Sequence, residues 1–377
     1  MTCDFQHLNR LDGFLQYLLL GQHQSVSDAI QSLPTNDPVA IWLRLVLRQG
    51  LPTSVESALP SHYAEQWRGW RAYYGGNYRL SAQHFSQAWM ALDNASITLG
   101  KADVALGLGK VYTRTGHWQA ARDWLLLSLA VARQQNRLFD IVQGYGALGE
   151  LLLRGGHPQS AYTCLSNAYH ILPPGSGQRP RQLNYLASAL LRCGETLRAE
   201  SLLMTSLHLA YDSNDNDSVW HALARLQFLR LNEGLTQKTP IEDITEALEG
   251  YVPSSENTPI ALGFLRLGQA VLEYRRGNRV AALSKIQSAK QFFGTPFSYE
   301  YWWALKWEAF LTDGMAVVDE TSLELLQLEP LLPPPQQVVL DLSWQRLKLP
   351  KDNGFMPLTR ESLETESLMA IRYLFFI

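Results

Sequence analysis

The chain has 377 residues, of which 46% are hydrophobic and 18% are charged, and its formal net charge at pH 7 is −3. This profile is typical of a globular protein and excludes both a disordered chain and a chain with a strong basic footprint for nucleic acid. Residues 1–10 are polar, the apolar run over 14–20 is too short for a signal peptide, and an 18-residue uncharged apolar run is absent, so we expect a cytoplasmic protein.

A glycine recurs at turn-like positions, and the spacing between successive glycines locates the helical hairpins. These glycines are Gly21, Gly50, Gly76, Gly116, Gly156, Gly194, Gly234, Gly277 and Gly314. Residues 1–63 predict abbreviated hairpins over Leu11–Leu33 and Ile41–Leu59, because prolines interrupt both. Over residues 64–332 the glycine spacing is close to 40 residues, which predicts full-length helix pairs.

Two central units, over 104–132 and 139–172, match position by position at a distance of 40 residues. The matched residues are Leu108-Gly109, Tyr112, Gly116, Ala121, Leu125 and Ser128 in one unit, and Leu148-Gly149, Leu152, Gly156, Ala161, Leu165 and Ala168 in the other. This order resembles the tetratricopeptide (TPR) repeat. The resemblance implies an all-α solenoid of helix-turn-helix units, wound as a right-handed superhelix, whose first helices line a concave groove.

Close packing of two antiparallel helices explains the small residues of the pattern. We expect Gly109 and Gly149 to let the second helix approach, with Ala121 and Ala161 facing them. The turn glycine ends the first helix because glycine tolerates the left-handed conformation there. Five units keep this pattern, those around Gly76, Gly116, Gly156, Gly194 and Gly277, whereas helical periodicity alone supports the other four.

Longer connections at 173–177, 212–217, 253–258 and 333–335 interrupt the array with turn formers and prolines. Residues 333–377 depart from the repeat and predict a helical cap or tail, with one helix over Gln336–Leu347 and another from Thr359. The apolar end, Leu368–Ile377, must be covered by the last repeat or by a partner.

No catalytic motif stands in the sequence, which lacks HExxH, GxSxG, a Walker-type loop and a GxGxxG after a strand. We therefore expect neither an enzyme nor a cofactor. His117 and His157 share a repeat position and recur because the unit recurs. The acidic run 212–217 lacks the glycine and glutamate of a calcium loop, so no metal is expected.

Cysteine and tryptophan usage points to packing. The three cysteines form no CxxC pair and favour small buried side chains in a reducing compartment over a disulfide or a metal site: Cys3, Cys164 and Cys193. Helical spacing predicts core positions for Trp67, Trp70 and Trp307, with one of the adjacent Trp302 and Trp303 exposed.

An arginine precedes the turn glycine by two residues in five units, as Arg48, Arg114, Arg154, Arg192 and Arg275. In TPR proteins this position lies at the edge of the groove, so the resemblance implies a solvated basic row suited to an acidic partner. A cation near a helix C-terminus also interacts favourably with the helix dipole, so chemistry of the helix ends is an equal alternative.

The resemblance maps further groove positions onto three successive units. They are Asp103, Leu106 and Lys110, then Gln143, Gly146 and Glu150, then Arg181, Asn184 and Ser188. From both sets we take the following as candidate partner-binding residues: Arg114, Arg154, Arg192, Lys110, Gln143, Glu150, Arg181, Asn184 and Ser188. The lysine and asparagine arrangement that holds a terminal carboxylate in chaperone-binding members is not reproduced.

These observations predict a non-enzymatic scaffold or adaptor that holds a segment of a partner protein and does not bind nucleic acid. The repeat spacing resembles that of bacterial signalling regulators and of cargo or polarity adaptors. Two alternatives stay open. One is a sensor whose array binds a short peptide and changes pitch. The other is an assembly factor for a membrane complex, in which the apolar tail or a partner supplies the only membrane contact.

Overall fold

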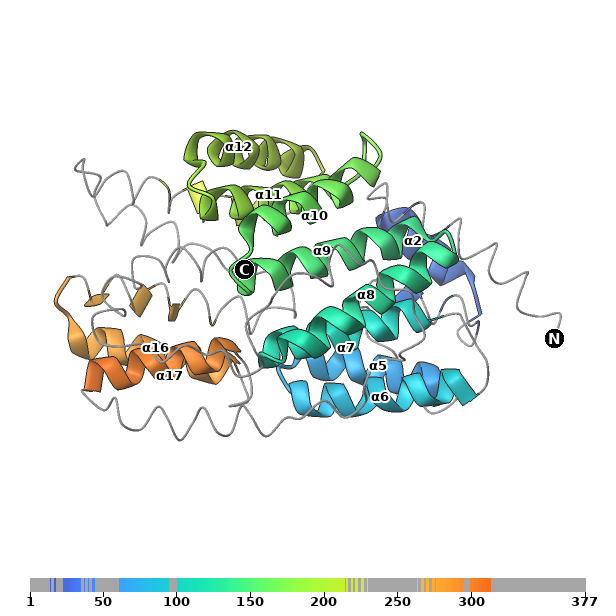
Figure 1. Ribbon diagram of the computed structural model, residues 1–377, viewed down its shortest axis with the longest axis horizontal. Coiled ribbons are helices and arrows are strands. Elements are labelled where there is room, and N and C mark those ends of the chain that lie inside the picture. Colours follow the sequence, from blue (N-terminus) through green and yellow to red (C-terminus); the bar gives the residue numbers. More distant parts are fainter. Residues whose placement is uncertain are drawn as a thin grey trace.

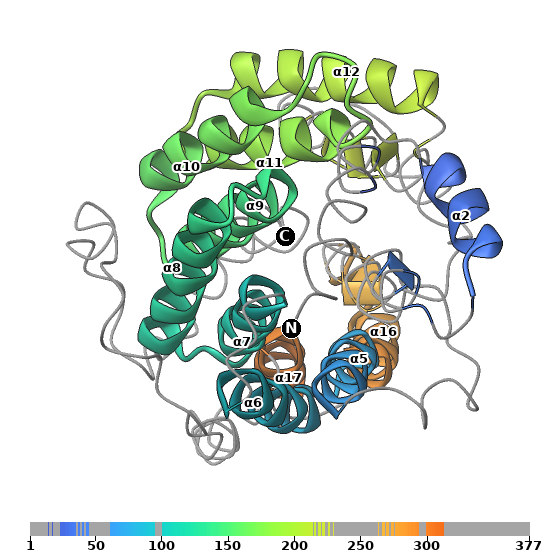
Figure 2. The same ribbon diagram turned by 90° about the vertical axis from the view of Figure 1, so that its right-hand side faces the viewer.

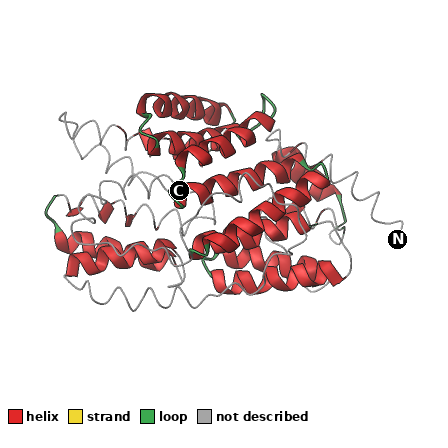
Figure 3. Ribbon diagram, in the orientation of Figure 1, coloured by secondary structure: helices red, strands yellow, loops and turns green. Residues whose placement is uncertain are grey.

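A computed structural model describes the central part of the chain and some flanking residues. The described residues are 14, 17, 23–34, 37, 40, 43–44, 61–94, 100–213, 215, 218–219, 221–222, 225–226, 229, 263, 266–267, 269–270, 273–274, 276–293 and 299–312. Every regular element within them is a helix (Figure 3). The bounds are α2 His23–Ser32, α5 Ser61–Tyr74, α6 Tyr78–Asn94, α7 Lys101–Thr115, α8 Trp118–Gln134, α9 Leu138–Arg154, α10 Pro158–Ile171, α11 Arg179–Arg192, α12 Thr196–Asp212, α16 Arg279–Phe293 and α17 Tyr299–Thr312.

The helices α5 to α12 form four consecutive antiparallel pairs, and each first helix contacts the first helix of the next pair. The pairs follow an arc in which α7, α9 and α11 lie on the inner side and α6, α8, α10 and α12 on the outer side (Figure 2). This arrangement confirms the expected TPR-like solenoid. Further along the chain, α17 contacts α7, so a later part of the solenoid returns against the second pair (Figure 1).

The turns within the pairs repeat one geometry. Gly76, Gly116, Gly156, Gly194 and Gly277 all have positive φ, between 76° and 81°. At each turn the N–H of the following residue donates to the carbonyl five residues earlier, as from His117 to Tyr112 at 3.0 Å. This bond is the signature of the Schellman motif, which satisfies the last carbonyls of a helix. The predicted turns of the five units with the complete pattern are thereby confirmed. The other four glycines of the repeat spacing, Gly21, Gly50, Gly234 and Gly314, lie outside the described residues.

The connection between two units can use the same motif without glycine. Asn136 has φ 53°, and the N–H of Arg137 donates to the Ala132 carbonyl at 3.0 Å, between α8 and α9. Asparagine tolerates the left-handed region better than most residues, which explains this choice. The sequence pattern did not single out this turn.

The residue packed against each helix glycine differs from our expectation. A Cβ on Gly109 would lie 2.6 Å from Leu125 Cδ2, and one on Gly149 would lie 2.5 Å from Leu165 Cδ2. The nearest side chains to these glycines are thus Leu125 and Leu165 rather than the predicted Ala121 and Ala161, although both alanines are buried. Because each glycine lacks a Cβ, it leaves room for a leucine of the second helix that stands one turn after the alanine.

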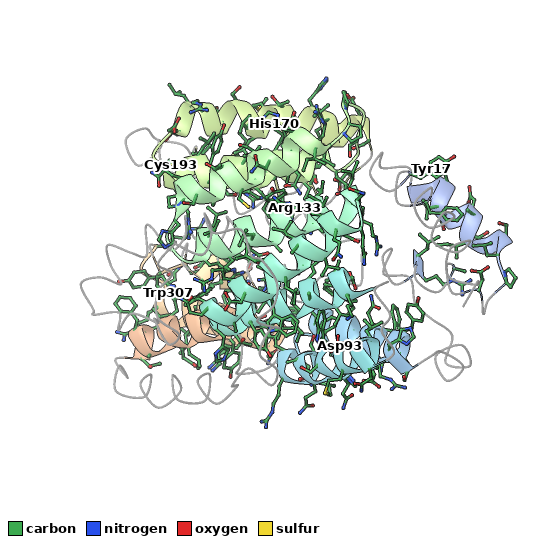
Figure 4. The ribbon with its side chains drawn as sticks, turned by 45° about the vertical axis from the view of Figure 1, so that its right-hand side comes forward. Tyr17, Asp93, Arg133, His170, Cys193 and Trp307 are labelled. Atoms are coloured by element: carbon green, nitrogen blue, oxygen red, sulfur yellow. The ribbon has the colours of Figure 1, made fainter. Side chains whose placement is uncertain are left out.

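Several other expectations concern packing. Trp67, Trp70 and Trp307 are buried as predicted, and Figure 4 labels Trp307 on α17. Cys164 is buried, and its Sγ lies 3.4 Å from the Tyr145 carbonyl, to which it donates. The side chains of Trp302 and Trp303 lie outside the described residues.

Other expectations fall wholly or largely outside the described residues. These are the two N-terminal hairpins, of which the structure describes α2 and a few further residues, the connections at 253–258 and 333–335, and the cap over 333–377. The connection at 173–177 is a turn, in which the Ser176 N–H donates to the Pro173 carbonyl at 3.0 Å. Within the described part of the chain, no helix combines the length and the apolar character needed to cross a membrane.

Candidate binding surface on the inner helices

The candidate residues lie on α7, α9 and α11 at matching repeat positions, 13, 10, 6 and 2 residues before the turn glycine. These are the inner helices of the arc (Figure 2). The structure brings most of the candidates into polar contacts between successive first helices. Three groups result, centred on Glu150, on Asp103 and on Ser188.

Glu150 joins two arginines of the predicted row. Its Oε1 lies 3.1 Å from Arg114 Nη2, on the preceding inner helix, and 3.2 Å from Arg154 Nη2, one turn along α9. Arg114 Nε also donates to the Tyr73 hydroxyl at 3.1 Å, so this group links α5, α7 and α9. Burial alone would raise the pKa of the Glu150 carboxyl, but the charges of Arg114, Arg154 and Lys110 outweigh burial and lower that pKa to about 2.

This geometry overturns the expectation of a solvated arginine row. The Arg154 side chain is fully buried and that of Arg114 is 12% exposed. Both guanidinium groups pair with the one Glu150 carboxylate inside the molecule, because a buried charge needs a partner. Arg192 is half-buried, while the side chains of Arg48 and Arg275 lie outside the described residues.

Asp103 receives neutral donors from α5. Its Oδ2 accepts hydrogen bonds from Gln66 Nε2 at 2.5 Å and from Trp70 Nε1 at 2.8 Å. Burial raises the pKa of the Asp103 carboxyl, and these hydrogen bonds with the charges of Arg137 and Lys110 offset only part of that rise. Asp103 thus carries the opposite shift to Glu150, although both join successive first helices.

The third group lies beyond α11. Arg225 Nε donates to Ser188 Oγ at 3.0 Å, and Asn184 Nδ2 donates to the Ser218 carbonyl at 3.1 Å. Arg225 is 1% exposed, and burial lowers its pKa to about 10. Burial, with the charges of Arg225 and Arg181, also holds the pKa of His221 well below its usual value, so that imidazole is neutral at physiological pH.

Two candidates, Gln143 and Arg181, are less enclosed. Gln143 Nε2 donates to Gln178 Oε1 at 3.3 Å. Arg181 is exposed, its guanidinium lies 6.0 Å from the centre of the Tyr185 ring, and Tyr185 is its main electrostatic and hydrogen-bonding partner. Arg181 is therefore the candidate whose charge is most open to a ligand.

The inner polar groups provide hydrogen bonding and charge. Among the described residues no group of three or more His, Cys, Asp or Glu side chains could hold a metal ion. His117 and His157 take the residue before α8 and α10 in successive units, consistent with recurrence of the unit. What these residues can do chemically is recognise a polar or charged segment.

Sequence reasoning missed two kinds of inner residue. Gln66 and Trp70 stand 10 and 6 residues before Gly76, at the positions of Asn184 and Ser188. The same mapping applied to the Gly76 unit would have found them. Arg225 belongs to the unit before Gly234, which lacks most residues of the repeat pattern, so its positions could not be aligned with those of the other units.

Comparison with known proteins gives a likeness at the level of structure. No family model matches the chain, and no curated protein matches it. Among solved structures, it resembles the crystal structure of a Rap protein complexed with Competence and Sporulation Factor, with a TM-score of 0.55 and 15% sequence identity over 86% of this chain and 98% of that chain. At this identity the likeness concerns the fold alone.

Proposed function

We propose that this chain is a non-enzymatic, cytoplasmic interaction module that holds a segment of a partner protein against its inner helices. One observation carries the proposal. Among the residues of the helices α5 to α12, every buried Asp, Glu, Arg, Asn and Gln side chain lies on an inner helix, and the further buried Arg137 directly precedes the inner helix α9, whereas the outer helices bury serines in place of such groups. Buried polar groups weaken a core unless they are paired, and the contacts described above pair many of them. Their confinement to the inner layer gives the array a polar inner face, on which Arg181 supplies an accessible charge for a partner.

The likeness to a solved protein adds support. The Rap protein was solved with Competence and Sporulation Factor bound, so a chain of this architecture can hold a partner. Fold alone does not define function, so the inner residues must carry the recognition. Arg181 is the most accessible charge among them, and we propose that it contacts an acidic or carboxylate group of the partner.

Photo-crosslinking tests the location of binding. A benzophenone amino acid replaces Tyr185, one turn after Arg181 on α11, or, as the matched control, Asn167, which is exposed on the outer helix α10. Both variants keep Arg181 and are incubated with native lysate, and mass spectrometry identifies the captured species. We expect capture at position 185 and none at 167. Capture at 167 alone would contradict the proposal.

The identity of the captured species separates the alternatives. A folded protein supports the scaffold, a short peptide supports the sensor, and a subunit of a membrane complex supports the assembly factor. Charge is tested with Arg181→Glu, which should weaken binding and reduce its dependence on salt.

The contact between α17 and α7 favours the sensor as the second candidate. A ligand that alters the tilt of the inner helices would alter the distance between these two helices. Spin labels at exposed positions, Thr312 on α17 and Asn94 on α6, report the distance from α17 to the helix that precedes and packs against α7. A shifted distance distribution on adding the bound species supports the sensor, and an unchanged one supports the rigid scaffold.

A further inference from the structure

The outer helix α12 carries an apolar stripe that faces solvent. Leu197, Met204 and Tyr211 recur every seven residues, and 79%, 50% and 59% of their surfaces are exposed. A seven-residue interval keeps side chains on one face of a helix, with a drift of about 20° per step. The opposite face of α12 packs against the array. In Figures 1 and 2, α12 lies at the outer edge of the molecule.

This stripe is particular to α12. Its residues stand 3, 10 and 17 positions after the turn glycine. The same positions carry Arg79, Ser86 and Asp93 in α6, Gln119, Leu126 and Arg133 in α8, Gln159 and Ser166 in α10, and Val280 and Gln287 in α16. The repeat itself therefore does not demand apolar residues there, and a stripe that exposes three large apolar side chains to water is typical of an interaction surface.

The stripe is symmetric about its centre. Leu197 and Tyr211 each stand seven residues from Met204. If two copies of α12 pack antiparallel with Met204 on the two-fold axis, Leu197 of one copy lies opposite Tyr211 of the other. A seven-residue repeat is the spacing with which helices pack side by side, and an isologous contact needs such a self-complementary patch.

Charges at the two ends select the antiparallel direction. Arg198 follows Leu197 and Asp212 follows Tyr211, and both side chains are exposed. An antiparallel pair brings each Arg198 near the second copy's Asp212, whereas a parallel pair would set like charges together. Arg198 also pairs with Glu195 and donates to the Tyr162 hydroxyl at 3.2 Å, and Asp212 pairs with His208. These contacts are solvent-exposed, so they contribute little and do not prevent this exchange.

We propose that the chain forms a homodimer through antiparallel packing of α12 against α12 of a second copy. The interface has Met204 at its centre, an apolar pair on either side and an opposite-charge pair at each end. It lies on the outer side of the arc and leaves the inner helices facing away from it. The proposal is independent of what those inner helices bind.

Sedimentation velocity of the full chain between about 1 and 100 μM, a range that spans weak and moderate dimers, gives the first test. We expect a concentration-dependent dimer. Met204→Lys places two ammonium groups at the axis and should raise the dissociation constant by about 100-fold or more. Val280→Lys is the matched control, because Val280 is 85% exposed and holds the repeat position of Leu197 on α16. This control should leave the dimer unchanged.

A charge exchange tests the direction. Asp212→Arg alone should weaken the dimer, and Arg198→Asp combined with Asp212→Arg should restore it. Met204→Cys should form an intermolecular disulfide under mild oxidation, and Val280→Cys should not. Each variant is first compared with wild type by thermal unfolding, which an exposed substitution should leave unchanged.

Three results would overturn the proposal. A chain that stays monomeric at 100 μM has no such dimer. A dimer that survives Met204→Lys uses another face. Failure of the double exchange to restore a dimer that Asp212→Arg had weakened would exclude the antiparallel arrangement.

Discussion

Asp103 and Glu150 occupy comparable places between successive inner helices, yet their surroundings shift their pKa values in opposite directions. Neutral donors from α5 hold Asp103, and burial dominates, so the pKa of its carboxyl is raised. At Glu150, burial acts in the same sense, but two arginines and a nearby lysine outweigh it and lower the pKa to about 2. Arg114 and Arg154 of the arginine row therefore neutralise Glu150 inside the molecule. A charge that a partner can reach must lie elsewhere on the inner helices.

Charge reversal of the row should have the largest effect. Replacing Arg114, Arg154 and Arg192 by Glu puts two new carboxylates beside Glu150 in a buried site. Because uncompensated buried charge is strongly unfavourable, we expect loss of cooperative unfolding in thermal circular dichroism. Arg192→Glu alone, at the same repeat position but half-buried where Arg154 is buried, should be milder. A triple variant that melts as wild type does would restore the idea of a solvated row.

The next largest effect is expected from replacing each carboxylate by its amide, which should cost more stability at Glu150 than at Asp103. Glu150→Gln leaves two buried guanidinium groups without their counter-charge and should cost about 3–5 kcal/mol. Asp103→Asn keeps an acceptor for Gln66 and Trp70 and removes a charge that burial disfavours, so it should cost less than about 1 kcal/mol. Urea unfolding at pH 7 measures both values. Equal losses would show that the difference between the two sites has no energetic consequence.

The pH dependence of stability sharpens the same contrast. Glu150 has a folded-state pKa of about 2 against an ordinary value of 4.5. Its contribution is therefore fully present above pH 4.5 and is lost as the pH falls toward 2. The difference of about 2.5 pKa units corresponds to about 3 kcal/mol. Unfolding free energies of wild type and Glu150→Gln, compared over this range, should converge at low pH. Parallel curves would contradict the assignment.

Helix spacing beside Glu150 offers a further probe. Gly149→Leu forces side-chain atoms into the space that Leu165 occupies, and overpacking of this kind costs about 1–3 kcal/mol, with added disturbance of both neighbouring units. Gly149→Leu combined with Leu165→Ala makes room and should recover part of the loss. Thermal unfolding of the single variant at the wild-type temperature would mean that the contact in the structure is wrong.

The smallest effect is expected beside Asp103. Ser128 Oγ on α8 donates to the Ala102 carbonyl at 2.7 Å, and Ser206 Oγ on α12 donates to the Pro180 carbonyl at the same distance. Ser128→Ala and Ser206→Ala should each cost about 0.5–1.5 kcal/mol. Denaturant midpoints check this range. A much larger loss for Ser128→Ala alone would indicate that this bond also positions Asp103.

The fold was predictable because its determinants are local and repeat. A turn glycine with positive φ, such as Gly116 or Gly156, is required by the conformation of one residue, so it can be recognised in sequence. The partner of Gly109 was not predictable from the pattern. It depends on how far one helix slides along another, and this places Leu125 rather than Ala121 over the glycine.

The candidate site was predictable as a set of positions and unpredictable as a set of interactions. Repeat register placed the candidates correctly on α7, α9 and α11. The ion pairs form between side chains of different units, so they depend on how the units pack. Arg114 reaches Glu150 across the gap from α7 to α9, and a pattern read along one unit contains no such pair.

The contact between α17 and α7 changes how the array should fold. In an open row of repeats, stability is a sum of neighbouring terms and either end can fray on its own. Here residues near 300 help to hold a helix near 110, so two parts of the array that are far apart in the sequence are thermodynamically linked. Such sequence-distant contacts slow folding, because a long loop must close before the contact forms. During synthesis, the second unit therefore gains its full stability only after α17 has been made.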